Sequence, residues 1–436
     1  MRDESLARDI EKRIRAESKT KFAALNLPDE FIAPNYSGRS IVNVSASIAK
    51  ILGSKINTPS LDADILGQFP NGVRRIVYVI ADAVGYGRLL KALDANPRNG
   101  FQALLKTGGR LVPITSVFPS TTTAALSAIW TGSTPAEHGF VGFQLFLREY
   151  GARSNMIAFN PVVTEKFGAQ QLVDAGLKPD KFLAVPSLPQ TLARVKVPVY
   201  NLIEQPYVKS ALSRVQIRGI TETYGFVTSS DMWVTLRYAL EQHLDERALF
   251  VAYWSAVDGI SHNYGPSSET VTAEIDNLAF SFEREFLGQL SRQARQGTLF
   301  LLSADHGQLD TPAQQAVYLR KHPKLRNRLI MDYAGEPRAA YLYCRTGEID
   351  AVRDYVTTRL ADKFFVMDST ATLNAGLFGA GKVAAEVKYR IGDLILLPRE
   401  NFYLWDRSDE PRLRGRHGGL AEKEMLVPLL VARLDG

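Results

Sequence analysis

Three apolar segments that each end at an aspartate constrain the fold of this 436-residue chain more than any other feature. They are RIVYVIA before Asp82, LFVAYWSAV before Asp258 and TLFLLSA before Asp305. Continuous runs of β-branched, aromatic and aliphatic residues are typical of strands that are buried on both faces. Each segment therefore predicts a buried strand that carries a carboxylate at its C-terminal end.

Helical patterns between these segments indicate an α/β fold. The clearest one covers Ser267–Gln296, where apolar residues recur at steps of three and four. Alternating strands and helices predict a mostly parallel central sheet that is flanked by helices. Ligands of such open sheets bind beyond the carboxyl ends of the strands. We therefore expect the three aspartates to meet at one site on that edge.

The remaining regions divide the chain into core segments and insertions. Two helices are expected near the N-terminus, over Met1–Leu25 and Ser40–Gly53. Between Gly151 and about Leu240 prolines are frequent and apolar runs are short, which indicates a cap inserted over the site. The expected organisation is an N-terminal helical segment (1–60), core (61–150), a cap insertion (151–240), core (241–310), a second insertion (311–399) and core closure (400–436).

Charge and cysteine content exclude several classes of protein. The 52 Lys and Arg residues exceed the 46 Asp and Glu residues by six, and no basic run forms an arm. This balance predicts a mild preference for anionic ligands and no specific nucleic-acid binding. Cys344 is the only cysteine, which excludes an intramolecular disulfide, a Cys-ligated zinc ribbon, an iron–sulfur site and a CxxC redox motif. We see neither a signal peptide nor a membrane span, expect a cytoplasmic protein, and leave the oligomeric state open.

Three of the six histidines accompany the strand-end aspartates. His262 lies four residues after Asp258, His306 directly follows Asp305, and His417 lies in the turn GRHGG. Taken singly, each of these residues is best explained as a helix cap or a hydrogen-bonded core group. Together, three carboxylates and three imidazoles predict two neighbouring divalent sites. Oxygen and nitrogen donors without sulfur suit zinc best, with manganese as the alternative.

A run of hydroxyl residues begins a helix within VFPSTTTAALSAIWTGSTPAEHG, residues 117–139. Pro119 and residues 120–123 have the composition of a helix start, and Gly132 ends the helical segment. The simpler interpretation is an N-cap with redundant hydroxyls. The functional one is that a threonine at the positive end of the helix touches a metal and attacks phosphorus.

Two segments resemble the metal-binding loops of nucleotide pyrophosphatase/phosphodiesterases, the type I phosphodiesterase family of the alkaline phosphatase superfamily. They are YWSAVDGISHNYGP (Tyr253–Pro266) and LSADHGQ (Leu302–Gln308). The resemblance implies an alkaline phosphatase-like core with two bound metals and a threonine nucleophile. It assigns one metal to Asp258, His262 and His417, and the other to Asp82, Asp305 and His306.

The same resemblance selects the nucleophile by its spacing. In the family it lies nine residues before the Thr of the helix-ending Thr-Gly, and counting back from Thr131 gives Thr122, with Thr121 as the nearest rival. Two departures stand out. The family has its nucleophile before a Phe-Pro pair, whereas in this chain Phe118-Pro119 precedes the candidate threonines. The family also has an Asn shortly after His-Gly that binds a phosphoryl oxygen, whereas this chain has Gln144 in the segment FVGFQ.

These features predict a two-metal hydrolase of phosphate diesters or nucleotide pyrophosphate bonds that forms a covalent phosphothreonine. A small anionic phosphate ester is the expected substrate, with nucleotides among the candidates. Because Gln144 replaces the family Asn, a phosphomonoesterase, a phosphonate hydrolase or a metal-dependent phosphomutase on the same core stays open. A catalytically silent metal-binding scaffold is the alternative from another class.

Three further features had weaker signals. GLFGAGKV (Gly376–Val383) fits the skeleton of a phosphate-binding loop but has Val383 where Ser or Thr is required, so we expect an ordinary loop. His138 has no ligand spacing around it and is expected to be structural. Arg412, Arg414 and Arg416 either contact a polyphosphate or nucleotide anion or form a solvated basic turn.

Overall fold

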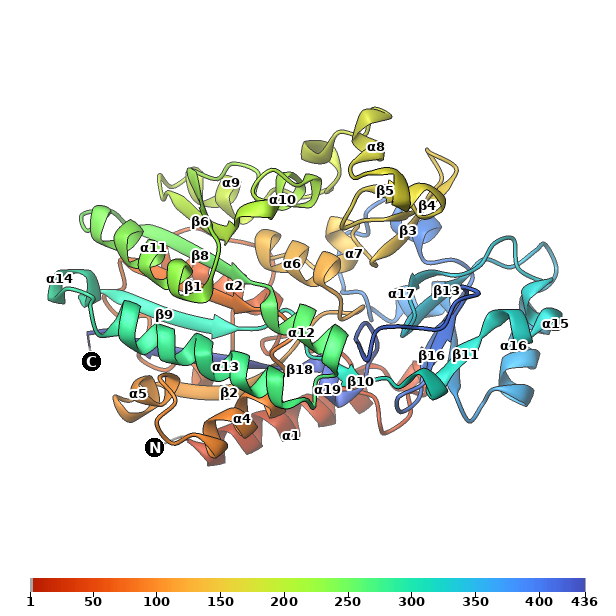
Figure 1. Ribbon diagram of the computed structural model, residues 1–436, viewed down its shortest axis with the longest axis horizontal. Coiled ribbons are helices and arrows are strands. Elements are labelled where there is room, and N and C mark those ends of the chain that lie inside the picture. Colours follow the sequence, from red (N-terminus) through yellow and green to blue (C-terminus); the bar gives the residue numbers. More distant parts are fainter. Residues whose placement is uncertain (1–2, 436) are drawn as a thin grey trace.

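The computed structural model describes residues 3–435, apart from the side chains of residues 165–167, and contains two seven-stranded sheets side by side (Figure 1). The central sheet has the strand order β2-β18-β9-β1-β8-β6-β7. Only β18 runs antiparallel to its neighbours, which confirms the predicted α/β fold with a mostly parallel sheet. Its strands are β1 (Arg75–Ala81), β2 (Arg110–Thr115), β6 (Val199–Glu204), β7 (Glu222–Phe226), β8 (Ala248–Trp254), β9 (Thr298–Ser303) and β18 (Leu426–Arg433).

The three predicted strands lie next to one another in the middle of this sheet. β1 pairs in parallel with both β8 and β9, so that Arg75 is level with Ala248 on one side and Thr298 on the other. All three strands are fully buried, as their apolar runs predict. One boundary differs: the strand expected to run to Val257 ends at Trp254, and Asp258 lies in the first turn of α12 (Ala256–Tyr264).

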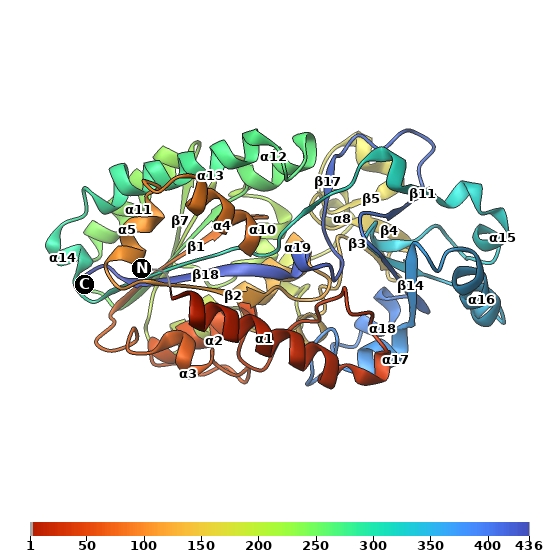
Figure 2. The same cartoon turned by 90° about the horizontal axis from the view of Figure 1, so that it is seen from below.

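Helices cover both faces of the central sheet (Figure 2). The predicted helix at Ser267–Gln296 is α13 (Glu269–Ser281), extended by a π-helical turn over Phe282–Leu287 and followed by α14 (Arg292–Arg295). It shares its layer with α4 (Tyr86–Ala95), α5 (Phe101–Lys106) and α11 (Ser229–Gln242). The opposite layer contains α2 (Ile41–Ile51), α6 (Thr122–Thr131), α9 (Leu188–Ala193) and α10 (Ala211–Gln216). The site lies at the edge where α6 begins.

Both predicted N-terminal helices form, although the first ends at Lys21 instead of Leu25, and Met1 and Arg2 lie outside the described residues. α1 (Glu4–Lys21) is capped by Asp3, whose carboxylate accepts a hydrogen bond from the Leu6 N–H at 3.0 Å, and it buries one narrow stripe. α2 begins after Ser40 and is almost entirely buried against α6. α2 therefore supports the helix that carries the candidate nucleophile.

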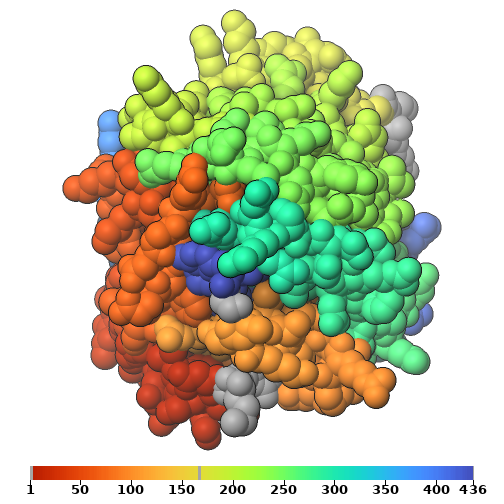
Figure 3. Space-filling view, turned by 90° about the vertical axis from the view of Figure 1, so that its left-hand side faces the viewer, coloured from red at the N-terminus to blue at the C-terminus, as the bar shows by residue number. Residues whose placement is uncertain are grey.

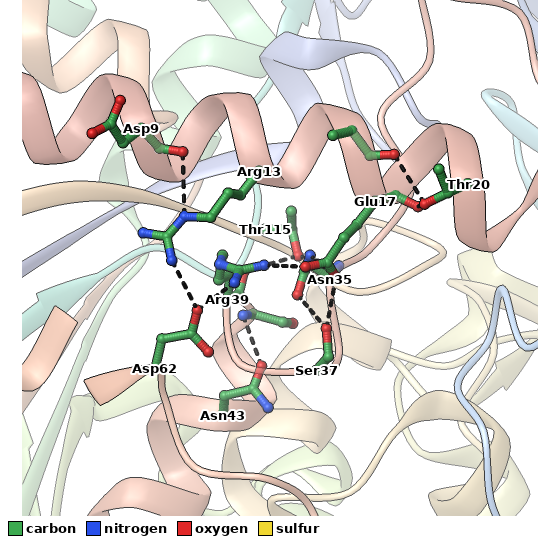
Figure 4. A network of polar contacts seen from close by, with 12 residues as sticks. Asp9, Arg13, Glu17, Thr20, Asn35, Ser37, Arg39, Asn43, Asp62 and Thr115 are labelled. Carbon is green, nitrogen blue, oxygen red and sulfur yellow. Dashed lines mark hydrogen bonds and ion pairs between the residues drawn. The ribbon is translucent and has the colours of Figure 1, made fainter. Parts of the chain in front are cut away.

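A polar network fastens α1 to the segment that leads into α2 (Figure 4). Arg39, whose side chain is 10% exposed, forms ion pairs with Glu17 and Asp62. The Glu17 carboxylate also accepts hydrogen bonds from Asn35 and Ser37, each at 2.8 Å. These contacts explain how a helix that is charged along most of its surface is fixed to the core.

At the end of the central sheet opposite the site, the last residues of the chain pack against the segment before β1 and the start of β9. Figure 3 shows the last residues of the chain (blue) between the early segment (orange) and the segment before β9 (teal). The Leu434 N–H donates to the Thr298 carbonyl at 3.1 Å, and Arg433 donates to the backbone of Phe69. β18 is thereby held beside β9, one strand in from the edge of the sheet.

The second sheet is antiparallel and has the order β14-β15-β13-β12-β3-β4-β5. Its strands are β3 (Gln144–Leu147), β4 (Ala152–Asn155), β5 (Asn160–Pro161), β12 (Ala334–Glu336), β13 (Ala339–Leu342), β14 (Phe364–Asp368) and β15 (Leu394–Pro398). α16 (Ile349–Arg359) and α17 (Ser369–Asn374) pack against β14. Two short pairs complete the strands, β10 (Leu309–Asp310) with β17 (Gly415–Arg416) and β11 (Ala316–Tyr318) with β16 (Tyr403–Trp405).

This arrangement divides the range 151–240 that was expected to form a cap. β4 and β5 join the second sheet, whereas β6, β7 and α11 belong to the central sheet. The sequence did not predict β6 as a strand of the core because it is only six residues long and lies between Pro198 and Pro206, as in a loop segment. The second sheet instead combines β3–β5 with strands from the second insertion.

Short helices fill the remaining connections: α3 (Ala63–Leu66), α7 (Pro135–His138), α8 (Gln171–Asp174), α15 (Pro323–Arg326), α18 (Val387–Arg390) and α19 (Glu422–Met425). The segment Gly376–Val383 forms turns and a loop and follows a helix rather than a strand, which argues against a phosphate-binding loop. Within residues 3–435, every helix is too short or too polar to span a bilayer.

Candidate active site

The structure brings the six predicted aspartates and histidines together at the carboxyl edge of the central sheet. They form two groups of three, and within each group the potential ligand atoms lie within 4.8 Å of one another. We call the fully buried group the buried triplet and the partly exposed group the open triplet. The buried triplet is Asp82, Asp305 and His306, and the open triplet is Asp258, His262 and His417. These are the two sets that the family resemblance implied.

The buried triplet is positioned by the ends of β1 and β9. Asp82 directly follows β1, and its backbone N–H donates to the Trp254 carbonyl at 2.9 Å. The Tyr253 hydroxyl donates to Oδ2 of Asp82. Asp305 accepts a hydrogen bond from the backbone N–H of His306 at 2.9 Å, which fixes one oxygen and leaves the other free. The parallel register of the two strands therefore delivers both carboxylates to one point.

The open triplet depends on a long-range pairing. Asp258 and His262 lie one turn apart on α12, with Nε2 of His262 3.3 Å from Oδ2 of Asp258. His417 follows β17, which pairs with β10 directly after the Asp305-His306 turn. The Ser120 N–H donates to the Gly418 carbonyl at 3.3 Å and ties the same turn to the start of α6.

Hydrogen bonds fix the same tautomer in all three imidazoles. In each ring Nδ1 lies within hydrogen-bond distance of a backbone carbonyl, which can only accept, so the hydrogen is on Nδ1 and Nε2 presents a lone pair. The carbonyl partners are Gly307 for His306 (3.1 Å), Gly415 for His262 (2.8 Å) and Ser120 for His417 (3.0 Å). Such backbone contacts orient histidines that ligate metals through Nε2.

The free atoms of the buried triplet fit a cation. Nε2 of His306 lies 3.4 Å from Oδ1 of Asp82 and 3.4 Å from Oδ2 of Asp305, and both oxygens are buried without a hydrogen-bond partner. A nitrogen lone pair and two carboxylate oxygens repel one another unless a cation lies between them. Donors about 2.1 Å from a tetrahedral ion are about 3.4 Å apart, so this spacing suits zinc.

The crowded carboxyls and imidazoles of the site shift one another's pKa values. Burial, and then repulsion from Asp305 and Asp258, raises the pKa of Asp82 well above its usual value. Burial acts the same way on Asp258, but the imidazoles of His262 and His417 outweigh it and lower its pKa. Burial and the neighbouring His306 depress the pKa of His417, which keeps that imidazole neutral. Burial lowers the pKa of His262, but the Asp258 carboxylate outweighs it and raises that pKa. A bound cation would displace the protons that these shifts favour on Asp82 and His262.

Thr122 is the hydroxyl residue that reaches the triplets. It is the first residue of α6, is 8% exposed, and has Oγ1 3.1 Å from Nε2 of His306. Thr121 is the N-cap residue, and its side chain is hydrogen-bonded to Glu336 instead. The Ser120 hydroxyl donates to the Gly419 carbonyl at 2.7 Å. The geometry therefore favours Thr122 over its neighbours.

A cavity of about 280 Å³ opens in front of Thr122 and the open triplet. Its walls combine residues of α6 and α12 with Gln144 of β3 and Glu336 of β12, which shows that the second sheet helps to shape the site. Among the lining residues are Phe143, Gln144, Ile157, Tyr333, Glu336, Trp405, Asp406, Leu413 and Arg416. The Gln144 side chain lies in this wall with its Oε1 buried and without a hydrogen-bond partner.

Two residues of the site were not identified from the sequence. Glu336 is 4% exposed and accepts a hydrogen bond from the Phe143 N–H at 2.7 Å, and burial raises the pKa of this carboxyl to about 8. The Gln308 side chain lies beside the open triplet, with its Nε2 3.5 Å from Oδ1 of Asp258. Gln308 ends the LSADHGQ segment, so its position after the Asp-His pair is the signal that could have found it.

The weaker candidates are also resolved. His138 is fully buried, its Nδ1 accepts from the Phe140 N–H at 3.0 Å, and burial lowers its pKa to about 3, as expected for a structural histidine. Arg412 and Arg414 are exposed, in agreement with a solvated basic turn. Arg416 differs from both because it is buried in the cavity wall.

Comparison with known proteins shows the family of the chain. The sequence matches the type I phosphodiesterase / nucleotide pyrophosphatase family over residues 77–420. Among curated proteins no sequence match was found.

Solved structures share the fold at low sequence identity. Murine ectonucleotide pyrophosphatase / phosphodiesterase 5 has a TM-score of 0.60 at 18% identity, over 82% of this chain and 87% of that chain. Its inactive threonine-to-alanine variant in complex with AMP has a TM-score of 0.58 at 17% identity, over 82% and 88%. Phosphonoacetate hydrolase from Sinorhizobium meliloti 1021, in complex with phosphonoformate, has a TM-score of 0.58 at 20% identity, over 82% and 89%. The family match covers most of the chain, and the protein belongs to the type I phosphodiesterase / nucleotide pyrophosphatase family, with the fold of the alkaline phosphatase superfamily.

Proposed function

We propose that the protein hydrolyses phosphate diesters or nucleotide pyrophosphate bonds through a covalent phosphothreonine on Thr122. The observation that carries this proposal is the contact between Thr122 Oγ1 and His306 Nε2 at 3.1 Å, beside six donors arranged as two triplets. The buried triplet would hold one divalent ion and the open triplet a second one. Zinc suits these donors best, with manganese as the alternative.

Thr122 attacks phosphorus in this mechanism. The bond from its oxygen to phosphorus forms while the bond from phosphorus to the leaving oxygen breaks, and water then hydrolyses the phosphothreonine. Its position at the first residue of α6 places the developing negative charge at the positive end of a helix. Two divalent ions supply Lewis acidity that lowers the pKa of the attacking hydroxyl and offsets charge on the phosphoryl oxygens.

Gln144 is the residue best placed to hold a nonbridging phosphoryl oxygen. It lines the same cavity as Thr122 and comes from β3, at the point where β3 meets β12 of the second sheet. A glutamine amide donates hydrogen bonds as an asparagine does, from a side chain that is one methylene longer. We therefore assign to Gln144 the role that the family gives to its asparagine.

A phosphonate hydrolase is the second candidate function. The cavity of about 280 Å³ lies just below the range of about 300–1,000 Å³ that is usual for ligand pockets, which favours a small substrate. One structural relative is a phosphonoacetate hydrolase, whereas another was solved with AMP. The cavity alone supports the smaller substrate class.

The decisive experiment compares substrate classes at matched metal. Purified protein is stripped with a chelator, reloaded with zinc or manganese, and assayed with bis-p-nitrophenyl phosphate, p-nitrophenyl thymidine monophosphate, p-nitrophenyl phosphate and phosphonoacetate. We expect metal-dependent turnover of at least one class, together with two bound ions per chain. A silent scaffold would show no turnover of any of these substrates. Hydrolysis that continues at the same rate after the metal is removed would contradict the two-ion site.

A further inference from the structure

Arg416 is a buried cation in the wall of the cavity that contains Thr122. Arg416 is 2% exposed. The central carbon of its guanidinium lies 3.9 Å from the centre of the Tyr403 ring and 5.5 Å from the centre of the Trp405 ring. Aromatic faces of this kind hold a guanidinium plane in one orientation and leave its edge available for hydrogen bonds.

That edge is only partly used by the protein. Nη1 of Arg416 donates to Oγ1 of Thr311 at 2.9 Å and to the Leu413 carbonyl at 2.8 Å, both of which are neutral groups. Nη2 is buried and has no hydrogen-bond partner. Among the ion pairs of residues 3–435, none involves Arg416.

Other buried arginines among the described residues have more partners. Arg39 and Arg390 each leave Nε without a hydrogen-bond partner, but both form ion pairs with carboxylates. Arg338 donates from Nε and Nη2 to the two carboxylate oxygens of Glu424, at 2.7 and 3.0 Å. Arg75 has no carboxylate partner, but its Nε donates to the Thr298 hydroxyl and both terminal nitrogens donate to backbone carbonyls. A buried charge without a partner is strongly unfavourable, so the unpaired state of Arg416 calls for a ligand.

The carboxyl groups of the cavity have other partners. Asp406 is paired with Arg153, and Asp258 belongs to the open triplet. Glu336 accepts its hydrogen bonds from the Phe143 N–H and the Thr121 hydroxyl. The positive charge of Arg416 is therefore left for a group that enters the cavity.

We propose that Arg416 binds a second anionic group of the substrate, so that the preferred substrates are small phosphate esters or phosphonates that carry a carboxylate or a further phosphoryl group. This inference rests on the proposed function for the place of the first phosphoryl group, beside Thr122. Guanidinium groups donate charge-assisted hydrogen bonds to carboxylates and phosphates, and Nη2 has no partner within the protein. Recognition of this kind sets substrate preference rather than the chemistry at phosphorus.

Binding is measured first, because it does not require turnover. Zinc-loaded protein is titrated calorimetrically with three ligands. Methylphosphonate has a single anionic group, phosphonoacetate adds a carboxylate, and methylenediphosphonate adds a second phosphonate. We expect the wild-type protein to bind at least one of the two larger ligands about 10- to 100-fold more tightly than methylphosphonate. In Arg416→Met this advantage should fall to less than about threefold, whereas Arg414→Met, which removes an exposed arginine, should retain it.

The comparison of variants separates Arg416 from the metals. If the advantage survives in Arg416→Met, the second group binds the ions and the inference is overturned. Equal binding of all three ligands by wild-type protein overturns it as well. Arg416→Lys keeps the charge without the planar fork, and we expect it to recover part of the advantage. Circular dichroism and zinc content of each variant exclude a folding defect as the cause.

A hydrolysis assay distinguishes failure of this inference from failure of the proposed function. Release of 4-nitrophenol is compared for 4-nitrophenyl propyl phosphate and 4-nitrophenyl 2-carboxyethyl phosphate. If neither is hydrolysed but the calorimetric preference depends on Arg416, the proposed hydrolysis fails and the anion site stands. If both are hydrolysed and no ligand preference depends on Arg416, the hydrolase stands and the anion site fails.

Discussion

Oγ1 of Thr122 lies 3.1 Å from Nε2 of His306, the nitrogen that also faces the unpartnered oxygens of Asp82 and Asp305. One hydroxyl, one imidazole and two carboxylates thus converge on a single point at the edge of the central sheet. This convergence explains why a helix start and two strand ends, distant in the sequence, act as one site. The predictions below follow from it and from the packing around it.

Removing a donor from the buried triplet should remove one ion. For His306→Ala we expect the zinc content to fall from about two ions per chain to about one, since three donors hold each ion and two hold it far more weakly. Inductively coupled plasma mass spectrometry of the dialysed protein measures this. His322→Ala, at a histidine outside both triplets, is the matched control and should keep two ions.

The buried ion pair of Arg338 and Glu424 should stabilise the turn that carries His417. Both side chains are fully buried, and Glu424 also accepts a hydrogen bond from the Gly419 N–H at 3.0 Å. Arg338→Met leaves a buried carboxylate unpaired, which costs about 3–5 kcal/mol of unfolding free energy. Arg8→Met breaks an exposed pair and should cost less than about 1 kcal/mol. Urea unfolding measures both losses, and an equal loss of unfolding free energy in the two variants would contradict a stabilising role for the buried pair.

His138 should make the protein less stable in mild acid. Burial lowers its pKa in the folded state to about 3, whereas the unfolded chain has the usual value of about 6.5. The unfolded state therefore binds the extra proton between these values, so this stability is fully present above pH 6.5 and is lost as the pH falls. Between pH 7 and pH 5 the loss from this group is about 2 kcal/mol.

The variant His138→Asn tests that assignment. Asparagine retains an acceptor for the Phe140 N–H but does not titrate in this range. Denaturant unfolding at pH 7 and pH 5 should show a smaller pH dependence for the variant than for the wild type, by about 2 kcal/mol. An unchanged pH dependence would mean that another group causes the acid sensitivity.

The sequence predicts the parts of the site that are local. The strand-end positions of Asp82 and Asp305 follow from their apolar runs, because a buried parallel strand has a composition of its own. The step of four between Asp258 and His262 places both on one face of α12. His417 could be assigned only through the family resemblance, since it reaches the site by the pairing of β10 with β17.

The parts that could not be predicted depend on pairing between distant segments. β3 lies beside β12 although about 190 residues separate Gln144 from Gly335, and no local pattern encodes such a pairing. Glu336 enters the cavity through this sheet, so its role had no signal. Arg416 was one of three similar arginines in the sequence, and only the packing on Tyr403 and Trp405 sets it apart.

The central claim is that Thr122 performs the chemistry at the two triplets. Its most direct test is the rate of hydrolysis of the best substrate by zinc-loaded Thr122→Ala and Thr121→Ala, with metal content measured on the same samples. The account predicts that Thr122→Ala keeps two ions and loses at least about 10³-fold in kcat, whereas Thr121→Ala loses less than about tenfold. A Thr122→Ala protein that holds two ions and turns over at the wild-type rate would contradict it.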